Sequence, residues 1–251
     1  MKLIQLKEKD YLYNIKKSNG EMLHTDIMLL GKLIYLMKRG FSPLIMVVGS
    51  QRMGKSFVAL WLALQILKFF HAGQKFDVKR NTFYDPIDAV KRLNILKREP
   101  LIIDEAGNYL MAKEWYSKIN IALEKIIMTQ GYLTNCYIMI SPFSSDIAKA
   151  FRKHFDFLIH VRKRGVAIVK QIPKRYDDLT GKVPVPYTVE RIKVSKKAIP
   201  QNVWRQYEEY SFMKKEEIRK NVVIQEKFLK KDMFGQVIDN DYEIIEKFKG
   251  D

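Results

Sequence analysis

Residues 49–56 constrain the fold of this chain more than any other stretch. Their sequence, GSQRMGKS, fits the pattern G-x-x-x-x-G-K-[ST]. The apolar run LIMVV, of strand length, precedes it, and KSFVALWLALQILKFF, of helical length, overlaps its end and continues the chain. A buried strand, a glycine-containing loop and a helix in this order form the first half of a βαβ unit. The sequence therefore predicts a phosphate-binding loop between a strand and a helix, against the alternative of a glycine-rich turn without a ligand.

The residue types in this loop suit a nucleoside triphosphate and its metal ion. Glycines allow successive backbone N–H groups and the start of the following helix to face a phosphate. Lys55 is expected to reach the β- and γ-phosphates, and the Ser56 hydroxyl to ligate Mg²⁺. The predicted ATP contacts are Gly49, Ser50, Gln51, Arg52, Met53, Gly54, Lys55, Ser56 and Phe57.

A second motif follows about fifty residues later, where the apolar run Leu101-Ile102-Ile103 ends in Asp104-Glu105. Ligands bind parallel sheets at the carboxyl ends of strands, where these two acids would lie. Asp104 can hold Mg²⁺ through water, and Glu105 can orient the attacking water or accept its proton. Taken alone, an acidic pair also suits a helix start. Its place after a phosphate-binding loop favours the catalytic interpretation.

Two further positions are weaker catalytic candidates. Ser141 ends the apolar run CYIMIS and could sense the γ-phosphate, or it could form only the turn before Pro142. Arg152 could stabilise transition-state charge in a neighbouring subunit, and Arg162 and Arg164 are alternatives. Each arginine could equally be solvated or contact nucleic acid.

The charge of the chain points to a nucleic-acid partner. Its 45 Lys and Arg against 28 Asp and Glu give a formal net charge of +17, although a solvated Lys-rich surface is the other explanation. Residues 149–175 contain nine basic residues and one acid, Asp156. We expect contacts to the DNA backbone without base readout. The predicted DNA-binding residues are Lys153, Arg162, Lys163, Arg164, Lys170, Lys174 and Arg175.

Strands that alternate with helices predict an α/β fold, a mostly parallel sheet with helices on both faces. Residues 1–40 are expected to contain a helix packed on the core and capped by Thr25 or Asp26; residues 41–175 form the core, and 176–251 a basic C-terminal appendage. Cys136 is the only cysteine, which fits a reducing compartment. The N-terminus lacks an apolar leader, and the apolar stretch 57–67 is too short to cross a bilayer. These features predict a protein of the cytoplasm, or of the host cytoplasm if a virus encodes it.

Over residues 44–169 the order of these parts resembles the FtsK–HerA division of P-loop ATPases, particularly its zonular-occludens-toxin-like and archaeal virus or plasmid members. The motifs GSQRMGKS and LIIDEAG carry the resemblance, and SPFSSDIAKAFRKHFDFLIHV is similar in layout. The resemblance implies a RecA-like sheet with an additional strand, and an oligomeric, usually hexameric, ATPase that moves DNA. Members commonly carry Gln where Ser141 stands, and Gln130 lies before that strand instead.

Two other functions remain open on the sequence. AAA+ initiators and loaders related to DnaA share both motifs, and a basic appendage would suit DNA binding, although the chain shows no convincing lid helix with a second sensor arginine. A nucleotide-gated interaction protein could use its positive charge on a membrane surface or an acidic partner. The lack of a long basic amphipathic helix with bulky anchors counts against that function.

Overall fold

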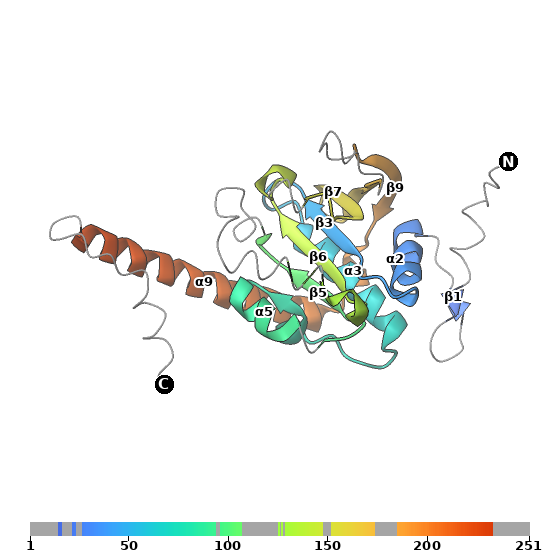
Figure 1. Cartoon of the computed structure of the whole chain (residues 1–251), viewed down its shortest axis with the longest axis horizontal. Coiled ribbons are helices and arrows are strands. Elements are labelled where there is room, and N and C mark those ends of the chain that lie inside the picture. The colour runs from blue at the N-terminus through green and yellow to red at the C-terminus, as the bar shows by residue number, and fades with distance from the viewer. Residues whose placement is uncertain are drawn as a thin grey trace. The chain divides into compact units, whose positions relative to one another are not determined.

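The computed structural model describes residues 15–16, 22–23, 27–93, 96–106, 125, 127, 129–147, 152–173 and 185–232. The chain divides into two compact units, Met1–Tyr207 and Glu208–Asp251. The first unit contains a seven-stranded sheet (Figure 1) and a separate antiparallel pair, β1 (Ile15–Lys16) with β2 (Met22–Leu23). The domain limits expected at residues 40 and 176 stay predictions.

The large sheet is mostly parallel, as the sequence predicts. Its strands run in the order β4-β5-β6-β3-β7-β8-β9, with parallel pairing from β4 to β7 and antiparallel pairing from β7 to β9. The strands are β3 (Leu44–Val48), β4 (Thr82–Phe83), β5 (Pro100–Ile103), β6 (Cys136–Ser141), β7 (Phe157–Lys163), β8 (Val166–Gln171) and β9 (Tyr187–Lys193). The additional strand is β6, because it lies between the strand before the phosphate-binding loop and the strand before Asp104. The last strand, β9, comes from beyond residue 176.

Helix α3 covers the parallel part of the sheet. The described helices are α2 (Met28–Lys38), α3 (Lys55–Phe70), α4 (Val78–Asn81), α5 (Pro86–Leu93) and α9 (Gln201–Asp232), with short 3₁₀ turns at Gln130–Leu133, Ser144–Asp146 and Lys196–Ala198. Helix α3 lies against β3, β5 and β6, and α2 packs on α3 (Figure 1). The sequence between β5 and β6 also predicts a helix around residues 119–129, which lies largely outside the described residues.

The strands are buried on both faces, which explains why their sequences are continuously apolar. All residues of β3, β5 and β6 are buried. Leu44, Met46 and Val48 join one core cluster with residues of β5 and β6, with Ala89 of α5 and with Phe155. The intervening Ile45 and Val47 are fully buried as well.

A carboxylate far along the chain caps helix α2. The side-chain oxygens of Glu190 in β9 accept hydrogen bonds from the backbone N–H groups of Met28 (3.1 Å) and Leu29 (3.0 Å). A negative charge at this position also interacts favourably with the helix dipole. The N-cap residue is Ile27, while the expected capping residues Thr25 and Asp26 lie outside the described residues.

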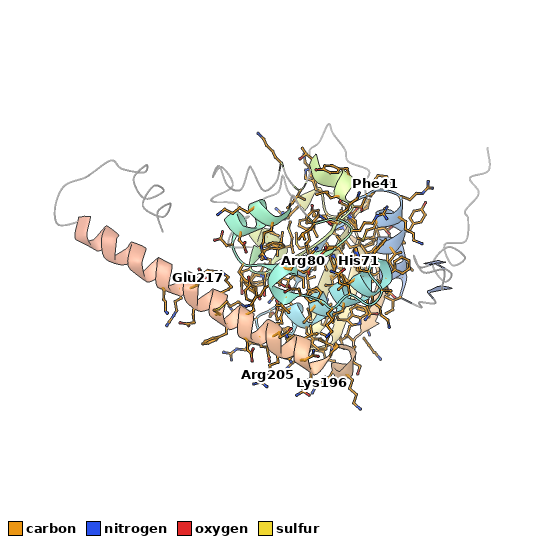
Figure 2. The ribbon with its side chains drawn as sticks, turned by 90° about the horizontal axis from the view of Figure 1, so that it is seen from below. Phe41, His71, Arg80, Lys196, Arg205 and Glu217 are labelled. Atoms are coloured by element: carbon orange, nitrogen blue, oxygen red, sulfur yellow. The ribbon has the colours of Figure 1, made fainter. Side chains whose placement is uncertain are left out.

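A buried polar network holds the start of β5. Glu99 is 3% exposed and pairs with Arg80, which Figure 2 labels; it also accepts a hydrogen bond from Asn81 at 2.8 Å. The side chain of Asn135 accepts from the N–H of Glu99 (3.0 Å) and donates to the carbonyl of Leu96 (2.8 Å). The network therefore fixes the entry into the strand that carries Asp104.

Candidate nucleotide-binding site

Three strands end at the same edge of the sheet and bring the two sequence motifs together. Strand β3 leads into the loop at residues 49–54, β5 leads into Asp104, and β6 ends at Ser141 between them. Val48 lies level with Ser141, and Ile103 lies level with Met139. The backbone N–H of Gly49 donates to the carbonyl of Pro142 at 3.2 Å, which joins the loop to the end of β6.

The backbone of the loop requires glycine at both of its glycine positions. Gly49 has φ +153°, and a Cβ atom there would lie 2.6 Å from the carbonyl oxygen of Val161 in β7. Gly54 has φ +86°, and a Cβ atom there would lie 3.2 Å from the Cα atom of Arg164. Arg52 also has a positive φ, +61°, which a residue with a side chain rarely adopts. The pattern of glycines in the sequence thus follows from the space and the backbone angles available.

Helix α3 begins directly at the loop, with its N-terminus free of acidic residues. Gly54 is the N-cap, and the first turn carries no carboxylate that would compete with an anion. The first N–H groups of a helix have no partner within the helix and favour negative charge. The Lys55 ammonium donates to the carbonyls of Gly49 (2.8 Å) and Ser50 (3.1 Å), so it lies over the loop. A helix start and a lysine therefore converge where the sequence predicts phosphate.

Asp104 and Ser56 meet across the site. Asp104 is 2% exposed, and its Oδ2 atom lies 3.5 Å from the Ser56 hydroxyl. Its Oδ1 atom accepts a hydrogen bond from the N–H of Glu105 at 2.9 Å. Glu105 is partly exposed and has φ +56°, a conformation that costs about 1–3 kcal/mol and is concentrated at functional sites.

Tyr207 belongs to this group, although the sequence motifs do not indicate it. Its hydroxyl donates to Oδ2 of Asp104 at 2.7 Å, and the residue is 3% exposed. Burial raises the pKa of Tyr207 well above its usual value, and the charge of Asp104 adds to this rise. Trp204, one helical turn earlier in α9, stacks on Tyr207 with ring centroids 5.9 Å apart. In the sequence, Tyr207 stands in the segment WRQYEEY, whose aromatic residues recur at helical spacing. That pattern is more typical of core packing than of a binding site.

The side chains of Phe57 and Ser141 make contacts within the protein. The ring of Phe57 packs edge-on against the ring of Trp204, with centroids 5.5 Å apart. The backbone of Phe57, and not its ring, therefore lies at the start of α3 beside the loop. Ser141 is buried at the end of β6, and its hydroxyl donates to the carbonyl of Phe143 at 3.0 Å. This bond is the turn interaction that the sequence offered as the alternative, and the sensor role of Ser141 stays a prediction.

The predicted basic residues lie at different ends of the sheet. Arg162, Lys163 and Arg164 lie at the end of β7, the edge of the phosphate-binding loop, and are exposed. Lys153 precedes β7, and Lys170 of β8 pairs with Leu158 near the start of that strand. Lys174 and Arg175 lie outside the described residues.

Arg152 lies near the start of β7, at the edge opposite to the loop. Its Nε atom is buried, and none of the described residues accepts a hydrogen bond from it. The catalytic role of Arg152 stays a prediction. The structure does not bring it to the loop of its own chain.

Arg164 lies against the loop instead. Its guanidinium lies 5.8 Å from the ring centroid of Phe57 and 5.5 Å from that of Trp204, both within cation–π range. Together with its approach to Gly54, these contacts hold the turn between β7 and β8 beside the start of α3. Arg164 therefore belongs to the surroundings of the phosphate-binding loop.

The oxygen donors at the site suit a hard cation. The described residues contain no cluster of three His, Cys, Asp or Glu side chains that could hold a metal ion by themselves. Mg²⁺ commonly binds through one or two protein oxygens and keeps its other positions for water and phosphates. Ser56 and Asp104 provide such a partial set, so the residues present fit Mg²⁺.

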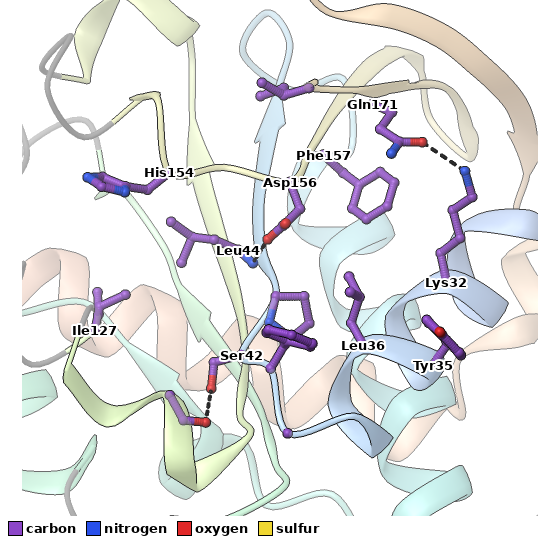
Figure 3. A pocket seen from close by; sticks show the side chains of 15 residues that line it. Lys32, Tyr35, Leu36, Ser42, Leu44, Ile127, His154, Asp156, Phe157 and Gln171 are labelled. Atoms are coloured by element: carbon purple, nitrogen blue, oxygen red, sulfur yellow. Dashed lines mark hydrogen bonds between the residues drawn. The ribbon is translucent and has the colours of Figure 1, made fainter. Parts of the chain in front are cut away.

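A separate cavity of about 630 Å³ lies at the opposite edge of the sheet (Figure 3). Its walls include Tyr35, Phe41 and Phe157. Polar side chains of its walls interact within the protein, since Lys32 donates to Gln171 at 2.8 Å and Asp156 accepts from the N–H of Leu44 at 2.8 Å. None of the predicted nucleotide contacts lines this cavity.

Comparison with known proteins finds solved structures that are similar to this chain. Neither a scan against protein-family models nor a search of curated proteins finds a match. The N-terminal domain of zonular occludens toxin from Neisseria meningitidis is 14% identical over 63% of this chain and 97% of its own, with a TM-score of 0.43. The genome packaging NTPase B204 from Sulfolobus turreted icosahedral virus 2, in complex with sulfate, is 14% identical over 62% of this chain and 99% of its own, with a TM-score of 0.39. The FIGL-1 AAA domain is 13% identical over 53% of this chain and 50% of its own, with a TM-score of 0.36.

The fold is that of a P-loop α/β protein: a mostly parallel sheet, a G-x-x-x-x-G-K-S loop between β3 and α3, and an acidic pair after β5. In the part of the chain that the structure describes, none of the helices has the length and apolar character needed to cross a membrane.

Proposed function

We propose that the chain is a Mg²⁺-dependent ATPase. The observation that carries this proposal is the meeting of the two motifs: the Ser56 hydroxyl of the loop lies 3.5 Å from the buried carboxylate of Asp104. A loop that only bound nucleotide would need no acidic pair at the same edge. An ATPase needs both halves, since the loop holds the phosphates and the acids serve the metal and the water.

Each residue has a distinct task in this proposal. Backbone N–H groups of the loop and of the α3 start bind phosphate oxygens, and Lys55 exchanges its carbonyl partners for stronger charge-assisted bonds to phosphate. Bound Mg²⁺ neutralises charge on the phosphates, and Ser56 and Asp104 would hold it. Glu105 orients a water molecule towards the γ-phosphate and accepts its proton. The left-handed backbone of Glu105 sets the direction of this side chain.

Three variants test the ATPase proposal. Lys55→Ala is expected to lose nucleotide binding and turnover. Glu105→Gln is expected to bind ATP but to lower kcat by about 10²–10⁴-fold, because the amide cannot accept the proton. Lys68→Ala removes an exposed lysine from the last turn of the same helix and serves as the matched control. Wild-type turnover by Glu105→Gln would refute the role of this carboxylate.

We further propose that the ATPase works on DNA in the cytoplasm, as an oligomeric motor related to the FtsK–HerA division. The net charge of +17 and the exposed Arg162 and Lys163 beside the nucleotide site support this proposal. A position for Arg152 away from the loop of its own chain suits a subunit ring, such as a hexamer, in which one subunit completes the site of the next.

The DNA proposal is tested by ATPase rates with and without single- and double-stranded DNA, with oligomer size measured by light scattering. Lys163→Glu is expected to weaken DNA binding and lower its dependence on salt, because it removes a phosphate contact and adds repulsion. Lys170→Glu makes the same charge change near the other end of the β7–β8 pair, and it shows whether that end also binds DNA. No stimulation by either DNA form would contradict a motor. Protection of one sequence without movement would instead favour an initiator.

A further inference from the structure

The start of helix α9 contributes a buried hydroxyl to the nucleotide site. Residues 201–207 of this helix belong to the same compact unit as the sheet. Within them, Tyr207 donates to Oδ2 of Asp104 at 2.7 Å, and both residues are almost fully buried. An apolar pair of similar size would fill the same space without the cost of removing a carboxylate from water. The polar pair therefore calls for a reason beyond packing.

The hydrogen bonds of Asp104 define the rotation of its carboxylate. Oδ1 accepts from the N–H of Glu105, while Oδ2 accepts from Tyr207 and lies 3.5 Å from the Ser56 hydroxyl. A carboxylate held through both of its oxygens cannot turn about its bond to Cβ without breaking a hydrogen bond. Each carboxylate oxygen has two lone pairs, so the bond from Tyr207 does not in itself prevent Oδ2 from accepting a second donor.

The neighbours of Tyr207 hold its ring in place. Trp204 stacks on the Tyr207 ring and contacts Phe57 of α3, which limits movement of the phenol.

We propose that Tyr207 is a positioning residue that holds Asp104 in the orientation that supports Mg²⁺ beside Ser56. The proposal rests on the proposed ATPase function and adds a third element, α9, to a site that the sequence assigns to β3–α3 and β5. Tyr207 acts through Asp104 and contacts neither nucleotide nor water in this role. Its effect should therefore appear in the metal dependence of nucleotide binding.

The test measures binding of a non-hydrolysable ATP analogue by calorimetry, first with Mg²⁺ and then with EDTA. Tyr207→Phe removes only the hydroxyl and is expected to weaken Mg²⁺-dependent binding about tenfold, as loss of a residue that orients a metal-supporting group does. Binding in EDTA should change less than about twofold, since the phosphate contacts remain. Tyr187→Phe removes a hydroxyl from a half-exposed tyrosine in β9 and is the matched control.

Two further variants separate positioning from stability. Val203→Ala trims a buried side chain of the same helix segment without touching Asp104, and it should leave the Mg²⁺ dependence unchanged even if unfolding becomes easier. In the background of Asp104→Asn, Tyr207→Phe should have no additional effect on Mg²⁺-dependent binding, because coupled residues do not act additively.

The outcomes distinguish this inference from the function on which it rests. Equal Mg²⁺ dependence of wild type and Tyr207→Phe would overturn the positioning role, as would an equal loss in Val203→Ala. Absence of nucleotide binding by the wild type would instead refute the proposed function. A selective loss in Tyr207→Phe, abolished by Asp104→Asn, supports the role.

Discussion

Replacing Gly49 by alanine tests the link between the phosphate-binding loop and the sheet. This glycine follows β3 directly and has φ +153°, a value that residues with a Cβ atom rarely adopt. The added methyl group would lie 2.6 Å from the carbonyl oxygen of Val161 in the neighbouring strand β7. That oxygen belongs to the backbone, so relief requires the two strands to move apart.

The magnitude follows from two separate costs. The backbone conformation costs a non-glycine residue about 1–3 kcal/mol. Forcing extra volume into a packed region costs about 1–3 kcal/mol more. We therefore expect Gly49→Ala to lower the free energy of unfolding by about 2–6 kcal/mol, if the costs add. Since 1 kcal/mol shifts Tm by about 2–4 °C at this size, the expected fall is at least about 4 °C.

Two other glycines provide graded controls. Gly73 has φ +90° with nothing within 4 Å of an added Cβ, so Gly73→Ala measures the backbone cost alone, about 1–2 kcal/mol. Gly131 has open space and no such backbone angle, so Gly131→Ala should be nearly neutral or slightly stabilising. Denaturant unfolding followed by circular dichroism gives all three values. If Gly49→Ala proved no more damaging than Gly73→Ala, the argument from the contact with Val161 would be wrong.

Two further predictions concern stability. Asn135→Ala should lower the free energy of unfolding by about 2–6 kcal/mol, because the N–H of Glu99 and the carbonyl of Leu96 would each be left unpaired in the core. The control is Asn202→Ala, at an exposed position. Equal stability of the two variants would contradict the role of the network. Burial lowers the pKa of His160 below 6.5, and the charges of Arg162 and Lys170 lower it further, so the unfolded chain binds this proton more readily. The neutral ring thus contributes stability that is present above pH 6.5 and is lost as pH falls through the lowered pKa of the folded state. The free energy of unfolding, plotted against pH over this range, should therefore have a different slope in wild type and in His160→Gln. Parallel plots would refute the assignment.

Local features of the sequence predict much of this fold, because local rules decide them. Continuous apolar runs locate β3 and β6, and the helix predicted after the loop begins at Lys55 and ends at Phe70, as the structure has it. Gly165, with φ +77°, forms the turn of the hairpin between β7 and β8. In each case the signal and the element occupy the same few residues.

Contacts between distant residues were not predictable in this way. Glu190 caps α2 from 162 residues along the chain, and Tyr207 reaches Asp104 across 103 residues. The sequence of strand β9 gives no strong apolar pattern, since its residues are mostly exposed or partly exposed. Its pairing with β8 depends on backbone hydrogen bonds, which are not specific to side chains.

The order of the strands explains why the site needs more than its two motifs. Strand β6 separates β3 from β5, so the strands that carry the motifs are about 10 Å apart in the sheet. The loop and the start of α3 cross this gap, since α3 contacts β3, β5 and β6, and Ser56 comes within 3.5 Å of Asp104. A carboxylate on a separate strand must then be held in one rotation for such a contact to persist. The bonds from Glu105 and Tyr207 do this, which is why an aromatic residue of α9 belongs with the motifs of the core.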